Sequence, residues 1–382
     1  MRDNIAVLAA CRSPIGKVPG LLNHVKEIDL LADVIKKTTM DLPSPSYAVI
    51  GSAFPIERDN LCRIAILHSG LPATIPALTV SKTCASSDEA LSIACHQIWQ
   101  SSVESALAGG SEKISNSSYT LHFMKRNVKN MIKQHLPKYE DIIHNIQENN
   151  MTYISEMLAH KYHITREMQD EYTIQSIHRA HKAKQMKWFD SEIIPIITSQ
   201  GTLDKDEMLD LDHNRAMITN APPMFVENGT LTQYNSAIMG DCACAVYLMD
   251  KKKAERQGLV PIGYIRDVWQ LAVSENYIGL SMAYCIDAIL KRNDLNMAEI
   301  NLFEINESFA SQALQIIRTC NLDINKVNVN GGNLALGYPI GATGLRMGMT
   351  LLYEMRRRNV RYGISVMCAG GNMANATLWE NV

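Results

Sequence analysis

The same arrangement of segments occurs twice along the chain, and this repeat constrains the fold more than any other feature. In the first copy, a loop around residue 84 opens a helix, and the next strand ends in Ala108-Gly109-Gly110. In the second, a loop over residues 328–343 opens a helix, and the next strand ends in Ala369-Gly370-Gly371. This predicts a duplicated fold whose two α/β halves pack face to face, with their loops meeting at one site. The alternative is two similar but unrelated α/β domains.

The repeated segments flank a stretch of different character. Residues 1–112 and those after Ala243 alternate strand and helix patterns, which is typical of a mostly parallel sheet covered by helices. Residues 113–230 are polar and mainly helical, with one long helix expected over 166–187 behind an N-cap at Thr165. The predicted units are an N-terminal half (1–112 plus 231–260), a helical insertion (113–230) and a C-terminal half (261–382).

Composition excludes several classes of protein. Of the 382 residues, 46% are hydrophobic and 20% charged, and the formal net charge is -2 without a long basic run, so nucleic acid is not an expected partner. The first apolar run is short and ends at Arg12-Ser13-Pro14, which fits a strand rather than a signal peptide or membrane span. The nine cysteines include no C-x-x-C pair, so we expect no metal site and free thiols in a reducing cytoplasm.

Two loops carry candidate chemistry. Cys84 stands between a predicted strand (77–80) and a helix, where the helix dipole and backbone N–H groups favour a thiolate and can hold an oxyanion. Residues 328–344 contain five glycines and a proline, so the backbone is tightly folded and can pass close to a ligand. No Gly-Lys-Ser/Thr follows, which excludes a phosphate-binding P-loop.

Two further segments complete the set. Residues 366–371 place a second cysteine, Cys368, at the end of a buried strand before two glycines. Residues 304–309 read Glu-Ile-Asn-Glu-Ser-Phe and include Asn306. Taken singly, core packing explains either cysteine, and the last segment is an ordinary helix start.

In this order, the four elements resemble the thiolase family over essentially the whole chain. The glycine-rich loop follows the family pattern Asn-x-x-Gly-Gly … Gly-His-Pro-x-Gly-x-Ser/Thr-Gly at every fixed position but one. Residues 12–17, 164–170 and 227–232 also resemble thiolase segments. The resemblance implies a five-layered α-β-α-β-α fold, in which the insertion 113–230 is a loop domain that covers the substrate and makes oligomer contacts.

The resemblance also implies a role for each candidate residue. Cys84 would take the acyl group from one thioester, Cys368 would move the α-proton of the second acyl group, and Asn306 would hold a water that donates to a thioester oxygen. The remaining expected site residues are Cys84, Gly370 and Gly371, through backbone N–H groups, for a second oxyanion hole, and Met151, Ser236 and Gly337 for substrate binding.

The one mismatch in the glycine-rich loop falls on the family's catalytic histidine, which is Tyr338 here, and no histidine follows His213. Tyrosine can donate to an oxyanion, but its reference pKa of about 10 makes it a poor base at pH 7. Losing a general base costs on the order of 10²–10⁴ in rate. Asp88 is expected to oppose ionisation of Cys84, and Asn372, in place of a glycine, to reduce backbone freedom.

The predicted function is that of an acetyl-CoA acetyltransferase or 3-ketoacyl-CoA thiolase of fatty acid metabolism. It would condense or cleave acyl-CoA thioesters through an acyl-cysteine, with coenzyme A and acyl-CoA as substrates and no tightly bound cofactor. The resemblance implies a homodimer or homotetramer. The alternative is a thiolase-fold protein that has lost Claisen chemistry and serves in acyl-CoA binding or complex assembly. A decarboxylating ketoacyl synthase would need two histidines that are absent from the matching places.

Overall fold

A computed structural model of the chain describes residues 4–54, 60–116, 151–211, 213–274 and 279–382. Within these residues, nine strands form one mixed sheet in the order β3-β2-β4-β7-β1-β8-β11-β10-β9, and β5 and β6 form a separate hairpin. No helix of this described part is long and apolar enough to cross a membrane.

The two halves use one plan of strands and helices. The first half contains β1 (Ile5–Arg12), α1 (Glu27–Thr38), β2 (Ala48–Gly51), α2 (Leu61–His68), β3 (Ala77–Val80), α3 (Ser86–Trp99), β4 (Ser105–Glu112) and β7 (Cys242–Asp250). The second contains β8 (Gly263–Ala272), α9 (Ser281–Arg292), β9 (Leu302–Ile305), α10 (Ala310–Thr319), α12 (Thr343–Arg358), β10 (Tyr362–Ala369) and β11 (Met373–Glu380). The strand order β3-β2-β4-β7-β1 is matched by β9-β10-β11-β8, and an isolated bridge from Phe303 to Val327 takes the place of β3. The predicted duplication is therefore confirmed.

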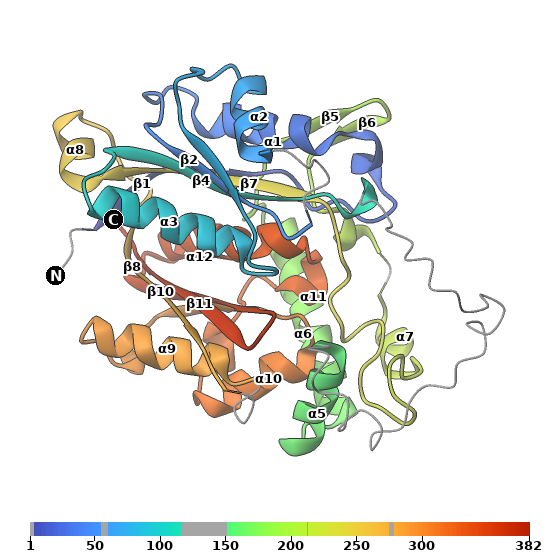
Figure 1. Ribbon diagram of the computed structural model, residues 1–382. Coiled ribbons are helices and arrows are strands. Elements are labelled where there is room, and N and C mark those ends of the chain that lie inside the picture. The colour runs from blue at the N-terminus through green and yellow to red at the C-terminus, as the bar shows by residue number, and fades with distance from the viewer. Residues whose placement is uncertain (1–3, 55–59, 117–150, 212, 275–278) are drawn as a thin grey trace, which may run out of the picture.

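The halves are stacked as five layers (Figure 1). Helices α1 and α2 cover the outer face of the first-half strands, and α9 and α10 cover the outer face of the second-half strands. Helices α3 and α12 lie between the two groups of strands. Among the described strands, the two groups pair with each other through β1 and β8, from Ile5 with Ile265 to Val7 with Gly263. The expected α-β-α-β-α architecture is confirmed.

Small residues let the middle helices approach the sheet closely. A β-carbon on Gly51 would overlap the backbone of Ser86 at the start of α3, and one on Gly110 would lie 2.8 Å from the Cα of Ala342. Leu91 of α3 and Leu345 of α12 then share one apolar core. Because Cys84 directly precedes α3, this packing fixes the position of the loop that carries it.

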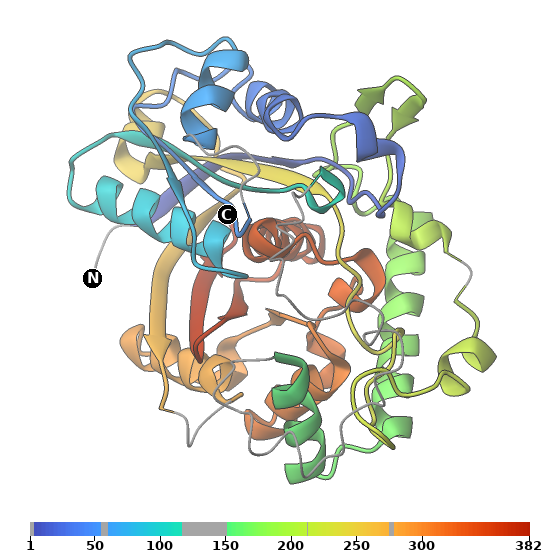
Figure 2. The same cartoon turned by 45° about the vertical axis from the view of Figure 1, so that its right-hand side comes forward.

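The insertion packs along the side of the molecule. Its elements are α5 (Met151–Lys161), α6 (Arg166–Gln185), β5 (Ile196–Thr198), β6 (Gly201–Leu203) and α7 (Arg215–Thr219). Figure 2 shows α5 and α6 beside the second half, where both contact α10. The Thr165 hydroxyl accepts from the Met168 N–H at 3.3 Å, which confirms the predicted N-cap of α6. Residues 117–150 of the predicted loop domain lie outside the described residues.

Arg12 is the last residue of β1, at the point where the first apolar run of the sequence ends, and its side chain is fully buried. Its guanidinium pairs with Asp206 at 2.7 Å and with Glu192 at 2.8 Å. Both carboxylates belong to the insertion, so this ion pair cluster attaches the insertion to the first-half strands.

Candidate active site

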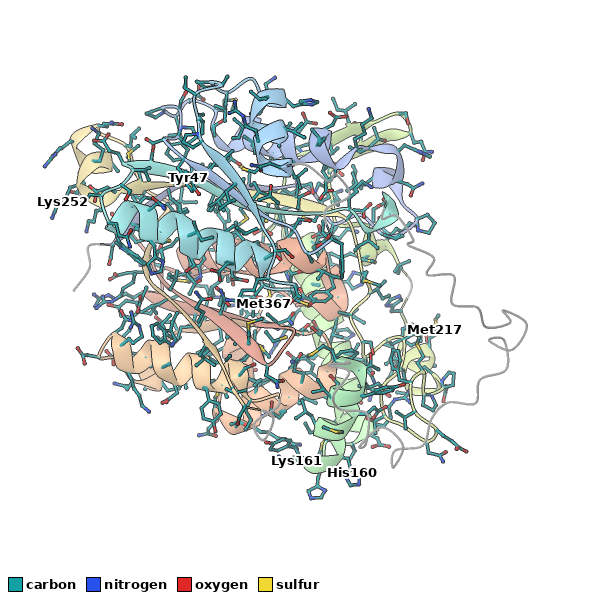
Figure 3. All side chains as sticks on the ribbon, in the orientation of Figure 1. Tyr47, His160, Lys161, Met217, Lys252 and Met367 are labelled. Atoms are coloured by element: carbon teal, nitrogen blue, oxygen red, sulfur yellow. The ribbon has the colours of Figure 1, made fainter. Side chains whose placement is uncertain are left out.

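Loops from the two halves meet, although Cys84 and Cys368 stand at different positions of the repeated plan. Cys84 lies between β3 and α3, and Cys368 lies near the end of β10. The Gly370 N–H donates to the Thr83 hydroxyl at 2.9 Å, which ties one loop to the other. The two cysteine sulfurs are close enough to raise the pKa of Cys84 by their mutual repulsion when ionised. Met367, beside Cys368, lies in the interior between the two groups of strands (Figure 3).

Amide groups surround Cys368. The Asn306 Nδ2 donates to its sulfur at 3.1 Å and to the Ser308 hydroxyl at 2.8 Å. The Gln312 Nε2, on α10, donates to the same sulfur at 3.4 Å. Burial raises the pKa of Cys368, while these donors oppose the rise because they stabilise the thiolate. Sequence reasoning missed Ser308 and Gln312, although Ser308 lies in the same short segment as Asn306.

Tyr338 lies between the two cysteines. Its backbone N–H donates to the Ile238 carbonyl at 2.8 Å, and its buried hydroxyl accepts from Ser308 at 3.2 Å. The hydroxyl also hydrogen-bonds Cys84. Burial, and then the two neighbouring sulfurs, raise the pKa of Tyr338 well above its ordinary value. At neutral pH this side chain is therefore a hydrogen-bond donor to Cys84 and not a base.

The backbone at the helix start lowers the pKa of Cys84, as expected, but burial has the larger effect. Burial raises the pKa of Cys84 to about 12, and this outweighs the opposing hydrogen bonds from Tyr338 and from its own backbone. The carboxylate that acts on it is Glu112, which accepts from the Gly341 N–H at 2.7 Å. Asp88, expected to play that part, instead lies buried against Gly344 of α12, where burial raises its pKa to about 7.

The predicted oxyanion hole is partly occupied by the protein itself. The Gly370 N–H, one of its expected donors, already bonds to Thr83. Thr83 has φ of 48°, a left-handed conformation that is uncommon for a threonine. Gly371 and Asn372 are also left-handed, with φ of 77° and 60°. Asparagine tolerates this region, so the chain keeps the expected turn at Asn372 without a third glycine.

Replacing Thr83 with valine is expected to speed acetylation of Cys84 about fivefold. Valine keeps the shape but removes the acceptor, so the Gly370 N–H becomes free for a thioester oxyanion. A neutral hydrogen bond contributes about 1 kcal/mol, which corresponds to that factor. The rate is measured by quenched-flow mass spectrometry with acetyl-CoA, and Thr83→Ser, which keeps the hydroxyl, should behave as wild type. A slower valine variant would show that the Thr83 hydroxyl assists the reaction.

The three residues predicted to bind substrate lie in different settings. Met151 begins α5 and packs against the second-half core. Ser236 forms a bridge with Phe309, and its buried hydroxyl has no partner among the described residues. Gly337 forms the turn before Tyr338, and its φ of 97° is a backbone conformation that residues with a side chain rarely adopt. A β-carbon at this position would also lie 3.0 Å from the Cγ atom of Met208.

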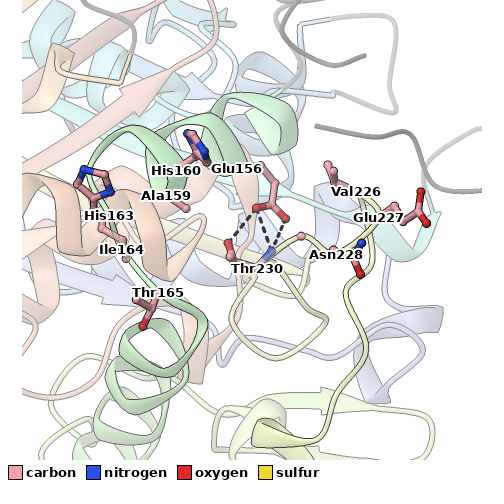
Figure 4. Close-up of a pocket in the computed structure, with 11 residues that line it drawn as sticks. Glu156, Ala159, His160, His163, Ile164, Thr165, Val226, Glu227, Asn228 and Thr230 are labelled. Carbon is pink, nitrogen blue, oxygen red and sulfur yellow. Dashed lines mark hydrogen bonds between the residues drawn. The ribbon is translucent and has the colours of Figure 1, made fainter. Parts of the chain in front are cut away.

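A separate pocket lies on the insertion. It has a volume of about 320 Å³ and is lined by α5 and residues 226–230, and neither Cys84 nor Cys368 is among its lining residues (Figure 4). On its wall, Glu156 accepts from the Thr230 N–H, the Thr230 hydroxyl and the Leu231 N–H, each at 2.9 Å. A side chain at Gly229 would overlap this carboxylate. Glu156 therefore anchors the segment that leads to Ser236.

Changing Glu156 to glutamine should destabilise the protein by about 2 kcal/mol, because an amide cannot accept all the bonds that the carboxylate accepts. We also expect a several-fold higher KM for coenzyme A with little change in kcat, since the segment before Ser236 loses its anchor. Thermal melting and steady-state kinetics measure the two effects. The matched control is Glu227→Gln, an exposed change on the same pocket. An unchanged KM would show that the segment before Ser236 takes no part in binding coenzyme A.

The fold is duplicated, and its site brings two thiols, one from each half, into one hydrogen-bond network. Sequence comparison agrees. The family described as "Thiolase, N-terminal domain" matches residues 5–252, and "Thiolase, C-terminal domain" matches residues 259–381. The chain therefore belongs to the thiolase family and is an acyltransferase by that membership.

Full-length relatives and solved structures agree with this membership. The 3-ketoacyl-CoA thiolase of Bacillus subtilis is 33% identical, with 98% of each chain covered. The acetyl-CoA acetyltransferase of Cupriavidus necator is 31% identical, with 99% of each covered. The human mitochondrial 3-ketoacyl-CoA thiolase in complex with CoA superposes with a TM-score of 0.90 at 28% identity, covering all of this chain and 98% of the other.

Proposed function

We propose that this protein transfers an acyl group between coenzyme A thioesters through an acyl-Cys84 intermediate. The observation that carries the proposal is the convergence of Cys84, from the first half, and Cys368, from the second, on one hydrogen-bond network with Asn306. A thiol is both a good nucleophile and a good leaving group, so an acyl-cysteine can form and break. The names of the relatives, and the coenzyme A complex of one of them, support the same substrate class.

The proposed reaction divides between the two cysteines. The Cys84 thiolate attacks the thioester carbonyl, and coenzyme A leaves as a thiol after taking the proton of the Cys368 thiol. The Cys368 thiolate then removes the α-proton of a second acyl-CoA, and the resulting carbanion attacks the acyl group on Cys84. This step forms 3-ketoacyl-CoA and releases Cys84 as a thiolate. Asn306 and the backbone N–H groups of Cys84, Gly370 and Gly371 are the proposed stabilisers of the thioester oxygens.

Ser236, Met151 and Gly337 are proposed to line the path of the coenzyme A arm. The unpartnered buried hydroxyl of Ser236 supports this role, because a buried polar group without a partner is unfavourable unless a ligand or water satisfies it.

A homo-oligomer, dimer or tetramer, is also proposed. Strand β3 is an edge of the sheet, and Leu78 on it is 39% exposed. Nearby Phe54 is 59% exposed. An apolar edge strand left open invites pairing with another chain, which a second copy would satisfy. A cytoplasmic location is proposed as well, and it is supported by all nine cysteines being free thiols.

Thiolysis of acetoacetyl-CoA by free coenzyme A tests the proposed function. We expect measurable acetyl-CoA formation that is slow at neutral pH, because the Cys84 thiol has a pKa of about 12 and Tyr338 is no base. Thermal melting with and without coenzyme A runs in parallel. If coenzyme A raises the melting temperature but no acetyl-CoA forms under any condition, the protein is the acyl-CoA-binding alternative.

A further inference from the structure

A buried arginine stands at the far end of the network that reaches both cysteines. Arg346 lies on α12 with no exposed surface, and its Nη2 donates to the Asn333 Oδ1. The Asn333 Nδ2 donates to the Asn306 Oδ1 at 2.6 Å. The Asn306 Nδ2 in turn donates to Cys368 at 3.1 Å and to Ser308 at 2.8 Å. In each of these hydrogen bonds, the donor therefore points toward the cysteine sulfurs.

The direction follows from the chemistry of the arginine. A guanidinium has only donors, so the oxygen of the Asn333 amide must face it. That leaves the Asn333 NH2 group toward Asn306, whose oxygen must accept. The NH2 group of Asn306 is then the end that faces Cys368 and Ser308. Without a donor-only group at its start, both amides could turn by 180° in nearly the same space.

The network continues from Ser308 to the second cysteine. Because the Ser308 hydroxyl accepts from Asn306, its own hydrogen points to the Tyr338 oxygen at 3.2 Å or to the Cys368 sulfur. Tyr338 then hydrogen-bonds Cys84. Both cysteine sulfurs thus lie at receiving ends of a donor chain that begins at Arg346.

We propose that Arg346 is a positioning residue: its cation sets the direction of the amide chain so that hydrogen-bond donors face Cys84 and Cys368 and stabilise their thiolates. The proposal rests on the proposed function, in which both sulfurs must ionise. This role accounts for a cation in the core, where the Arg346 Nε and Nη1 have no hydrogen-bond partner among the described residues. Its other charged neighbours are Glu304 on β9 and the ion pair cluster of Arg12, Glu192 and Asp206.

The test compares three variants by their thiol reactivity. Arg346→Lys keeps a donor-only cation, Arg346→Gln puts a group that can donate or accept at the start of the chain, and Asn333→Asp reverses the chain. In Asn333→Asp the carboxylate still pairs with Arg346, which offsets its charge and preserves the fold, but it accepts the NH2 group of Asn306 and draws it away from Cys368 and Ser308. Alkylation of Cys84 and Cys368 by iodoacetamide is followed from pH 6 to 11 by peptide mass spectrometry.

Each of the two sulfurs faces Tyr338, Glu112 or the other cysteine as a titrating or charged group. All three variants leave these groups in place. We expect Asn333→Asp and Arg346→Gln to slow alkylation of Cys368 at pH 8 about tenfold or more and Arg346→Lys to stay within about threefold of wild type. Cys84 should follow in the same order with a smaller change.

The proposal is overturned if Asn333→Asp and Arg346→Gln leave both alkylation profiles at wild type. It is also overturned if Arg346→Lys loses as much reactivity and melting temperature as Arg346→Gln, because packing alone would explain that pattern. Alkylation needs no turnover. A wild type without thiolysis activity would therefore contradict the proposed function while leaving the expected order of alkylation rates intact.

Discussion

Replacing Tyr338 with histidine is expected to raise the rate of acetoacetyl-CoA thiolysis on the order of 10²–10³-fold at pH 7.5, since it supplies the missing general base. The hydroxyl of Tyr338 already hydrogen-bonds Cys84, so an imidazole at this position has the nucleophile within reach. Ser308, which donates to the tyrosine oxygen at 3.2 Å, would then accept from the far ring N–H and turn its own hydrogen to Cys368. Initial rates at saturating coenzyme A measure the gain.

The pH dependence of the two proteins separates a new base from a changed pocket. Because burial raises the pKa of Cys84 to about 12, the wild-type thiolate fraction rises about tenfold for each pH unit across the alkaline range. The wild-type rate should follow this rise, whereas the Tyr338→His rate should level off near neutral pH. Tyr338→Phe, the matched control, keeps the ring but loses the donor to Cys84 and should fall below wild type. A wild type that is already fast and flat with pH would mean that another group serves as base.

The features that could be predicted from sequence are those encoded within a short stretch of chain. The duplicated loop-helix-strand order, the strand at 77–80 and the Thr165 cap each depend on neighbours within a few residues, and each is present. The glycine-rich loop was recognisable for the same reason. Its close approach to the rest of the site requires small residues at fixed spacing, and Gly337 has the positive φ of 97° that such a turn needs.

What sequence reasoning missed depends on contacts between distant segments. The helix-end argument for Cys84 is a local one, but burial among Tyr338, Cys368 and Glu112 decides its pKa. Asp88 is next to the same helix start, yet the position of α12, fixed by the whole fold, turns it toward Gly344. The hydrogen bond between the Gly370 N–H and the Thr83 hydroxyl joins residues 287 positions apart, so the sequence around either residue does not predict it.

Two single substitutions should show which step of the reaction each thiol performs. Cys84→Ala is expected to abolish both the acetyl adduct formed with acetyl-CoA and thiolysis, because no other described thiol combines this loop position with the Tyr338 hydrogen bond. Cys368→Ala should still form the adduct on Cys84 but lose condensation and thiolysis by on the order of 10³-fold or more, since proton transfer at the α-carbon has no donor or acceptor.

Intact-mass and peptide mass spectrometry after brief mixing with acetyl-CoA follow the adduct. Cys285→Ala is the control, because that thiol is also buried but lies on α9 against β8 and β11, outside the hydrogen-bond network of the site. It should keep both adduct and turnover. The assignment depends on a difference between the hydrogen-bond partners of the two sulfurs. Cys84 hydrogen-bonds the Tyr338 hydroxyl, whereas Cys368 accepts from two side-chain amides, at 3.1 and 3.4 Å. Acetyl groups that persist in Cys84→Ala and map to Cys368 would reverse the two roles.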